Sequence, residues 1–172
     1  VEQPEDLFAL ASTSLVALLV VGDPLQATTH VDLQLQAAEA GIECRVFHGI
    51  SITTLVTGAI GLSNYRFGRQ TTLTYPYGGW VATSPLETII VNRYTGLHTL
   101  ALLDLDPTGL GTGDQRPMMP DDAVASIELM RLKIEEGLAE REFSDDKASD
   151  LLTKAALQSF VEEDVSQMRV VL

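Results

Sequence analysis

The stretch Leu15-Val-Ala-Leu-Leu-Val-Val-Gly-Asp-Pro24 decides the fold that we expect for this chain. Its first seven residues are apolar, and Gly22-Asp23-Pro24 ends the run. A short run that is apolar on both faces and is followed by turn residues is typical of a strand buried on both sides in a parallel sheet. We therefore predict a buried strand over residues 15–21.

The residues that follow this strand predict helices and strands in alternation. We expect a helix over 28–40 that ends at Gly41, a strand over 43–47 and a helix over 50–62. A weaker helical signal precedes the strand, over residues 1–12. Alternating strands and helices with short turns indicate an α/β fold with a parallel sheet and right-handed crossovers.

The residue pattern of the sequence changes after residue 70, and a domain boundary is plausible near residues 63–70. The second half predicts strands and helices of its own, and its last part is acidic and helical in propensity. The expected elements are a strand over 71–75, a loop over 76–83, a helix over 85–94, a strand over 98–105, a helix from Pro120 and helical chain after Phe143.

Composition excludes several classes of function. The 172 residues hold 24 acidic and 11 basic side chains, a net charge of −13, so a nucleic-acid partner is not expected. Cys44 is the single cysteine, which excludes an internal disulfide and a cysteine-based metal cluster. The longest apolar run is far shorter than the roughly 20 residues of a membrane span, so we expect a soluble, cytoplasmic protein without a membrane partner.

The acidic residues are concentrated in the second half of the chain. Residues 101–172 carry a net charge of −9, and only three of the basic residues of the whole chain are lysines. Solvated helix faces alone can explain this pattern. Halophilic adaptation also fits, because net charge keeps a protein soluble and strong salt screens the self-repulsion.

Candidate binding residues follow the predicted strands. In an open α/β sheet, ligands bind beyond the carboxyl ends of the strands. These ends carry Gly22-Asp23-Pro24, His48 to Ser51, and Asp104, which favour a small polar cofactor over a metal. Structural interpretations stay open: Gly-Asp-Pro is a common turn, Ser51 is a natural helix cap and Asp104 can cap a turn.

Four blocks of sequence carry a resemblance to a known family. They are Leu19-Val-Val-Gly-Asp-Pro-Leu-Gln-Ala-Thr-Thr-His30, Arg45-Val-Phe-His-Gly-Ile-Ser-Ile52, Gly61-Leu-Ser-Asn-Tyr-Arg-Phe-Gly68, and Asn92-Arg93 with Gly96-Leu-His-Thr-Leu-Ala-Leu-Leu-Asp104. In this order the chain resembles the diphthine synthases, a family in the tetrapyrrole-methylase-like class of S-adenosylmethionine methyltransferases. The resemblance covers about residues 10–137.

The resemblance implies a fold, a reaction and a site. It implies two α/β domains with S-adenosyl-L-methionine between them, a homodimer, and methylation of the amino group of the modified histidine of translation elongation factor 2 in diphthamide biosynthesis. The implied cofactor-binding residues are Asp23, Ser51, Ile52 and Leu103. A fifth contact is a glycine in the family, and Gln26 stands at the matching position here.

The family pattern extends beyond both ends of the chain, so we expect an incomplete tetrapyrrole-methylase-like architecture, truncated at both ends. Residues 1–65 are expected to be the remainder of the N-terminal α/β cofactor-binding domain, residues 66–142 a part of the C-terminal α/β domain, and residues 143–172 an acidic, helical tail. Two alternatives remain: a catalytically inactive fragment that acts as a dimerisation or interaction module, and a methylase of the same class with a small tetrapyrrole-type substrate. No residue stands out as a general base.

Overall fold

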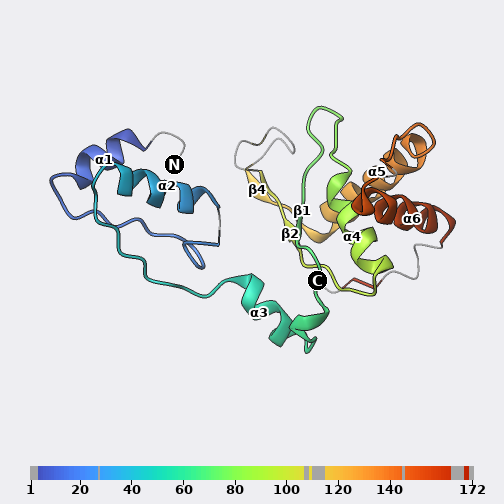
Figure 1. Cartoon of the computed structure of the whole chain (residues 1–172), viewed down its shortest axis with the longest axis horizontal. Helices are drawn as coiled ribbons and strands as arrows, with labels where there is room; N and C mark the ends of the chain where they lie inside the picture. Colours follow the sequence, from blue (N-terminus) through green and yellow to red (C-terminus); the bar gives the residue numbers. More distant parts are fainter. Residues whose placement is uncertain are drawn as a thin grey trace. The chain divides into compact units, whose positions relative to one another are not determined.

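The computed structural model divides the chain into two compact units, Val1–Leu62 (unit 1) and Ser63–Leu172 (unit 2). It describes residues 4–26, 28–106, 109, 115–144, 146–163 and 169–170. Figure 1 colours both units along the sequence, with unit 1 in blue to cyan. The expectations that fall on residues 164–168 and 171–172, within the acidic tail, lie outside the described residues.

Unit 1 contains the helices α1 (Glu5–Ala11), α2 (Thr28–Glu39) and α3 (Ile52–Ala59). The helix predicted over 28–40 is confirmed by α2, which buries Leu33 and Ala37. Gly41, just beyond α2, has a φ of +72°, the left-handed conformation that ends many helices and that glycine adopts without strain. The second predicted helix is confirmed in part, because α3 is shorter than the range 50–62.

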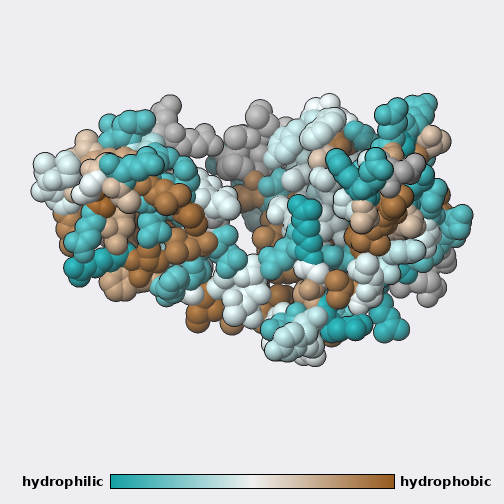
Figure 2. Space-filling view, viewed as in Figure 1, coloured by the Kyte–Doolittle hydropathy of each residue, from teal (hydrophilic) through white to brown (hydrophobic). Residues whose placement is uncertain are grey.

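The two strands predicted for unit 1 are wrong. Residues 15–20 and 42–50 run as irregular chain, and residues 15–20 make no backbone hydrogen bond to any residue that the structure describes. A strand needs a hydrogen-bonded partner, whatever its own propensity. As a result Leu15, Leu19 and Val21 are almost fully exposed, and Figure 2 shows hydrophobic residues, in brown, at the surface of unit 1.

Unit 2 is a mixed α/β unit in which two short strands pair in parallel. β1 (Thr71–Leu73) pairs with β2 (Ala101–Leu103), and α4 (Ser84–Tyr94) lies between them in the sequence. This β-α-β connection confirms the predicted α/β class. The remaining elements are η1 (Asn64–Arg66), β3 (Leu105–Asp106), which pairs antiparallel with β4 (Arg116–Pro117), α5 (Pro120–Gly137) and α6 (Ala148–Glu162).

The core of unit 2 lies among its three long helices. Leu86 of α4, Met130 of α5 and Leu157 of α6 are fully buried, and Leu73 of β1 joins the same cluster. Helix α6 packs against α4, so this part of the expected acidic tail belongs to the core of unit 2 (Figure 1). Among the described residues, no helix is long and apolar enough to cross a membrane.

The side chain of Asn92 joins three segments of unit 2. It is 5% exposed, and its Nδ2 donates to the carbonyl of Arg69 and to Oγ1 of Thr99, both at 2.8 Å. Its Oδ1 accepts from the backbone N–H of Arg69 at 3.2 Å. A Cβ at Gly68 would lie 2.2 Å from this Oδ1, so a side chain there would push the Asn92 amide out of its present position. The Asn92 block of the sequence therefore has a structural role, because it holds α4 against the chain that leads into β1 and β2.

Candidate functional site

Two loops of unit 1 meet through their glycines. A Cβ at Gly49 would lie 2.2 Å from the carbonyl oxygen of Gly22, far closer than real Cβ atoms come. Gly22 itself has a φ of +86°, a conformation that other residues rarely adopt. This backbone contact places the segment Gly22-Asp23-Pro24 beside the segment that ends at Ser51, as the strand-end argument requires, although neither predicted strand forms.

The carboxylate of Asp23 is held at this junction from both sides. Its Oδ1 accepts the backbone N–H of Leu25 at 2.9 Å, and its Oδ2 accepts Nδ1–H of His48 at 2.8 Å. The Leu25 N–H, followed by the His48 side chain and the Gly49 N–H, holds the pKa of Asp23 below its ordinary value against the opposing effect of desolvation. Asp23 is therefore an ionised, oriented acceptor at neutral pH.

Ser51 and Ile52 form the N-terminus of α3. The Ser51 hydroxyl accepts the backbone N–H of Thr53 at 3.3 Å and its Oγ1–H at 3.1 Å, which confirms the helix-cap interpretation. Ser51 is 8% exposed, and no described acceptor takes its own hydroxyl hydrogen. The N–H of Ile52 is one of the N-terminal groups that a helix leaves without an internal partner. Both groups can donate to a polar ligand.

Gln26 lies in the same loop, at the position where the resemblance described above implies a glycine. Its backbone N–H donates to the carbonyl of Asp23 at 3.2 Å, and its side chain is exposed. Among the described residues only glycines have a positive φ. The backbone at Gln26 is thus in a conformation open to any residue, so this departure from the family introduces no strain.

Leu103, the remaining implied contact, lies in unit 2 at the end of β2 and is 39% exposed. The next residue, Asp104, accepts hydrogen bonds from two backbone segments at this strand end. Its Oδ1 accepts the backbone N–H of Leu105 at 2.9 Å, and its Oδ2 accepts that of Tyr75 at 3.2 Å. The structure therefore assigns Asp104 the turn-capping role that the sequence left open.

Asp23, Gln26, Ser51 and Ile52 all belong to unit 1, and the contact of Gly22 with Gly49 brings Asp23 and Ser51 together. The sequence named His48 at a strand end but did not reveal its bond to Asp23. The signal that could have identified the junction is a pair of glycines, Gly22 and Gly49, beside the two polar residues, since glycine is the residue that permits close backbone approach.

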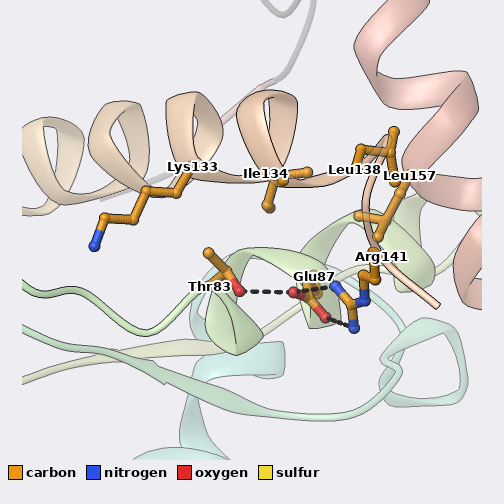
Figure 3. A pocket seen from close by; sticks show the side chains of 8 residues that line it. Thr83, Glu87, Lys133, Ile134, Leu138, Arg141 and Leu157 are labelled. Atoms are coloured by element: carbon orange, nitrogen blue, oxygen red, sulfur yellow. Dashed lines mark hydrogen bonds and ion pairs between the residues drawn. The ribbon is translucent and has the colours of Figure 1, made fainter.

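A separate pocket of about 240 Å³ lies in unit 2, lined by residues of α4, α5 and α6. Figure 3 shows Glu87 at its base, with Thr83 on one side and Arg141 on the other, while Lys133 extends away from them. Glu87 accepts from Thr83 at 2.7 Å and from both terminal nitrogens of Arg141 at 2.7 and 2.9 Å. Burial raises the pKa of Glu87, but these hydrogen bonds outweigh burial and hold the pKa below its ordinary value. This pocket contains none of the implied cofactor residues.

Several known proteins are similar to this chain. It is 40% identical over 132 residues to a diphthine synthase of Methanoregula boonei, covering 77% of this chain and 50% of that protein. It is 50% identical over 91 residues to a diphthine synthase of Methanocella arvoryzae, covering 53% of this chain and 35% of that protein. A crystal structure of diphthine synthase superposes with a TM-score of 0.65 at 36% identity, covering 77% of this chain and 48% of that one.

The chain thus spans half the length, or less, of these curated relatives. The family model of the tetrapyrrole (corrin/porphyrin) methylases matches residues 2–108, which include the Asp23 and Ser51 junction and both strands of the parallel pair. Since this match takes in more than half of the sequence, the chain belongs to the tetrapyrrole methylase family.

Proposed function

We propose that this chain is part of a diphthine synthase. This enzyme uses S-adenosyl-L-methionine to methylate the amino group of the modified histidine of translation elongation factor 2 in diphthamide biosynthesis. The family is that of methylases, and similar proteins from two archaeal species are named diphthine synthase. The observation that carries the proposal is the junction of Gly22 with Gly49, which presents the Asp23 carboxylate beside the N-terminus of α3.

The residues at this junction suit a cofactor that carries positive charge and hydrogen-bonding groups. The Asp23 carboxylate offers an oriented negative charge, while the Ser51 hydroxyl and the Ile52 N–H offer donors. The Gly22 and Gly49 backbones approach so closely that a side chain at position 49 would collide with the Gly22 carbonyl, so this contact holds Asp23 beside Ser51. We propose that Asp23, Gln26, Ser51 and Ile52 of unit 1 hold the cofactor, with Gln26 contributing its backbone. The resemblance to the diphthine synthases implies Leu103 as a further contact.

The chemistry asked of these residues is binding and positioning. When bound, S-adenosylmethionine would supply a methyl group on a sulfonium sulfur, which would be transferred in line to the acceptor nitrogen with a neutral thioether as the leaving group. Most of the acceleration in such a transfer comes from orienting the reactants and excluding water. The acceptor nitrogen has to be neutral to attack, so it loses a proton, and solvent can take that proton. Asp23 orients the methyl donor, and the reaction does not require it to move a proton.

Calorimetric titration with S-adenosylmethionine in molar KCl tests the cofactor site. We expect saturable one-site binding to the chain, and we expect Asp23→Ala to weaken it without unfolding the protein, which circular dichroism checks. A folded chain that does not bind would contradict the proposal in favour of an inactive fragment that acts as an interaction module. An unchanged dissociation constant in the variant would remove Asp23 from the site.

The substrate is tested separately, because the family model also includes methylases of tetrapyrroles. A methyl-transfer assay should offer elongation factor 2 and a corrinoid precursor side by side. We expect methylation of the protein substrate alone, because the Ala-Thr-Thr-His and Gly-Leu-His-Thr blocks resemble the diphthine synthases. Transfer to the corrinoid alone would replace this substrate with the small-molecule alternative.

The proposal also includes the oligomeric state of the protein and the salt concentration in which it works. We propose that it acts as a homodimer in a cytoplasm of high salt concentration. The net charge of −13 and the small number of lysines support halophilic adaptation. Sedimentation in molar KCl measures the oligomeric state directly, and a monomer at micromolar concentration would contradict the dimer.

A further inference from the structure

At the junction of unit 1, the exposed side chain of His48 holds the shielded carboxylate of Asp23. Nδ1 of His48 lies 2.8 Å from Oδ2 of Asp23, and the two side chains are 68% and 18% exposed, respectively. An ionised carboxylate has no hydrogen to donate, so the hydrogen of this bond lies on Nδ1 of the imidazole. The neutral ring then carries no hydrogen on Nε2, and this nitrogen can take up a proton.

The bond from His48 is the one that orients Asp23 toward the other loop of the junction. Oδ1 of Asp23 accepts the backbone N–H of Leu25 at 2.9 Å, which fixes the carboxylate only within its own loop. The His48 bond spans 25 residues and comes from the segment that leads into Ser51 and α3. From that segment the Gly49 N–H also lowers the pKa of Asp23, but less than the His48 side chain does. His48 therefore sets the direction of the carboxylate relative to the N-terminus of α3.

Asp23 is also the charged group on which a change at His48 acts first. No charged side chain other than Asp23 occurs in the two segments that form the junction and α3, residues 21–26 and 49–59. In the segment that precedes His48, Glu43 and Arg45 bond to each other at 3.0 Å, and their side chains are 77% and 79% exposed. The charge of the imidazole is therefore coupled mainly to the carboxylate of Asp23.

We propose that His48 is a positioning residue of the ligand site at Asp23, and that a proton on its imidazole weakens the binding of a positively charged ligand there. The proposal rests on the proposed function, which supplies that ligand, S-adenosylmethionine. With a neutral imidazole the pair has a charge of −1, because Asp23 is ionised. A proton on Nε2 brings the charge of the pair to zero, and the ligand loses its net attraction. Histidine side chains gain this proton between about pH 5 and 8.

Calorimetric titration with S-adenosylmethionine at pH 7.5 and at pH 5.5 tests this coupling. One proton that competes with a ligand weakens its binding by at most about tenfold for each pH unit. We expect the dissociation constant of the unaltered chain to be about tenfold higher at pH 5.5 than at pH 7.5. We also expect binding to release protons at pH 6, which appears as a binding heat that differs between buffers of different ionisation enthalpy. An equal dissociation constant at the two pH values would overturn the proposal.

Three variants, each checked for folding by circular dichroism, separate positioning from proton uptake. His48→Asn keeps an N–H donor near the place of Nδ1 but cannot take up the proton, so it should bind within about twofold of the unaltered chain at pH 7.5 and show no pH dependence. His48→Ala removes the donor and should bind about fivefold more weakly at pH 7.5. His98→Asn, at a histidine of unit 2, is the matched control and should keep the pH dependence. If His48→Asn kept it too, another group would be responsible and the proposal would be wrong.

The nitrogen NMR signals of the three histidine rings separate a failure of this proposal from a failure of the proposed function. The bond that one ring nitrogen makes decides which nitrogen carries the hydrogen, so an Nδ1–H form of neutral His48 reports its bond to Asp23. We expect this form at pH 8 and its loss in Asp23→Ala; if that variant does not fold, the unaltered chain decides. If the form is present but S-adenosylmethionine binds at neither pH, the proposed function fails and the positioning of Asp23 stands. If S-adenosylmethionine binds and the form is absent, the proposed function stands and the role of His48 is refuted.

Discussion

Replacing Asn92 with alanine should destabilise unit 2 substantially. The change removes three hydrogen bonds, two of 2.8 Å and one of 3.2 Å, from a side chain that is 5% exposed. At about 1 kcal/mol for each bond, the loss is about 3 kcal/mol. Alanine recovers about 0.6 kcal/mol through its higher helix propensity in α4. We therefore expect the free energy of unfolding to fall by about 2.5 kcal/mol.

Urea unfolding followed by Trp80 fluorescence measures this change, because the only tryptophan lies in unit 2. Asn64, the other asparagine of the chain, is exposed, and Asn64→Ala is the matched control with an expected change of about 0.5 kcal/mol or less. Asn92→Asp should cost more than Asn92→Ala, because it loses both donated bonds and buries a charge. A loss in Asn92→Ala no larger than in Asn64→Ala would refute the structural role of Asn92.

Three further outcomes are expected. Gly49→Ala should weaken S-adenosylmethionine binding about tenfold or more in calorimetry, since its Cβ would lie 2.2 Å from the Gly22 carbonyl oxygen, whereas Gly58→Ala, with nothing within 4 Å, should bind normally. Glu87→Gln should lower the free energy of unfolding by about 2 kcal/mol at pH 7. Because folding lowers the pKa of Glu87, the stabilisation by its carboxylate is complete above the unfolded pKa and is lost as the pH falls through the folded pKa. In urea unfolding, Glu87→Gln should therefore lower the free energy of unfolding less at pH 3 than at pH 7, and an equal loss at the two pH values would contradict this prediction. Molar KCl should raise the melting temperature by about 4 °C or more over low salt in a thermal scan, and no gain would exclude halophilic adaptation.

Helices were predictable from the sequence because their hydrogen bonds are local. The starts of α4 and α5 carry Pro85 and Pro120, and the structure confirms both helices close to their predicted ranges. Strands depend on partners far along the chain, so propensity alone was misleading over residues 15–21 and 43–47. The predicted strands over 71–75 and 98–105 did find each other and form the parallel pair of β1 with β2.

Part of the candidate site was also predictable from the sequence, and part depended on contacts between distant segments. Asp23 and Ser51 were chosen as neighbours from a rule about strand ends, and the structure brings them together through Gly22 and Gly49. The bond from His48 to Asp23 spans 25 residues and depends on how the two loops fold, so no local pattern contained it. Turn and cap chemistry at Ser51 was visible in the sequence, since a helix start needs only its own neighbours.

The exposed apolar segment of unit 1 also sets how the protein behaves in storage and handling. Residues 15–20 make no backbone hydrogen bond to any described residue and carry exposed leucines, which suits strand-to-strand addition between copies. At moderate ionic strength the charge of −13 on each molecule keeps copies apart, but the screening length falls from about 10 Å at 0.1 M salt to about 3 Å at 1 M. Salt at 1 M therefore removes this colloidal protection, so dilution, rather than added salt, is the way to keep preparations free of aggregates.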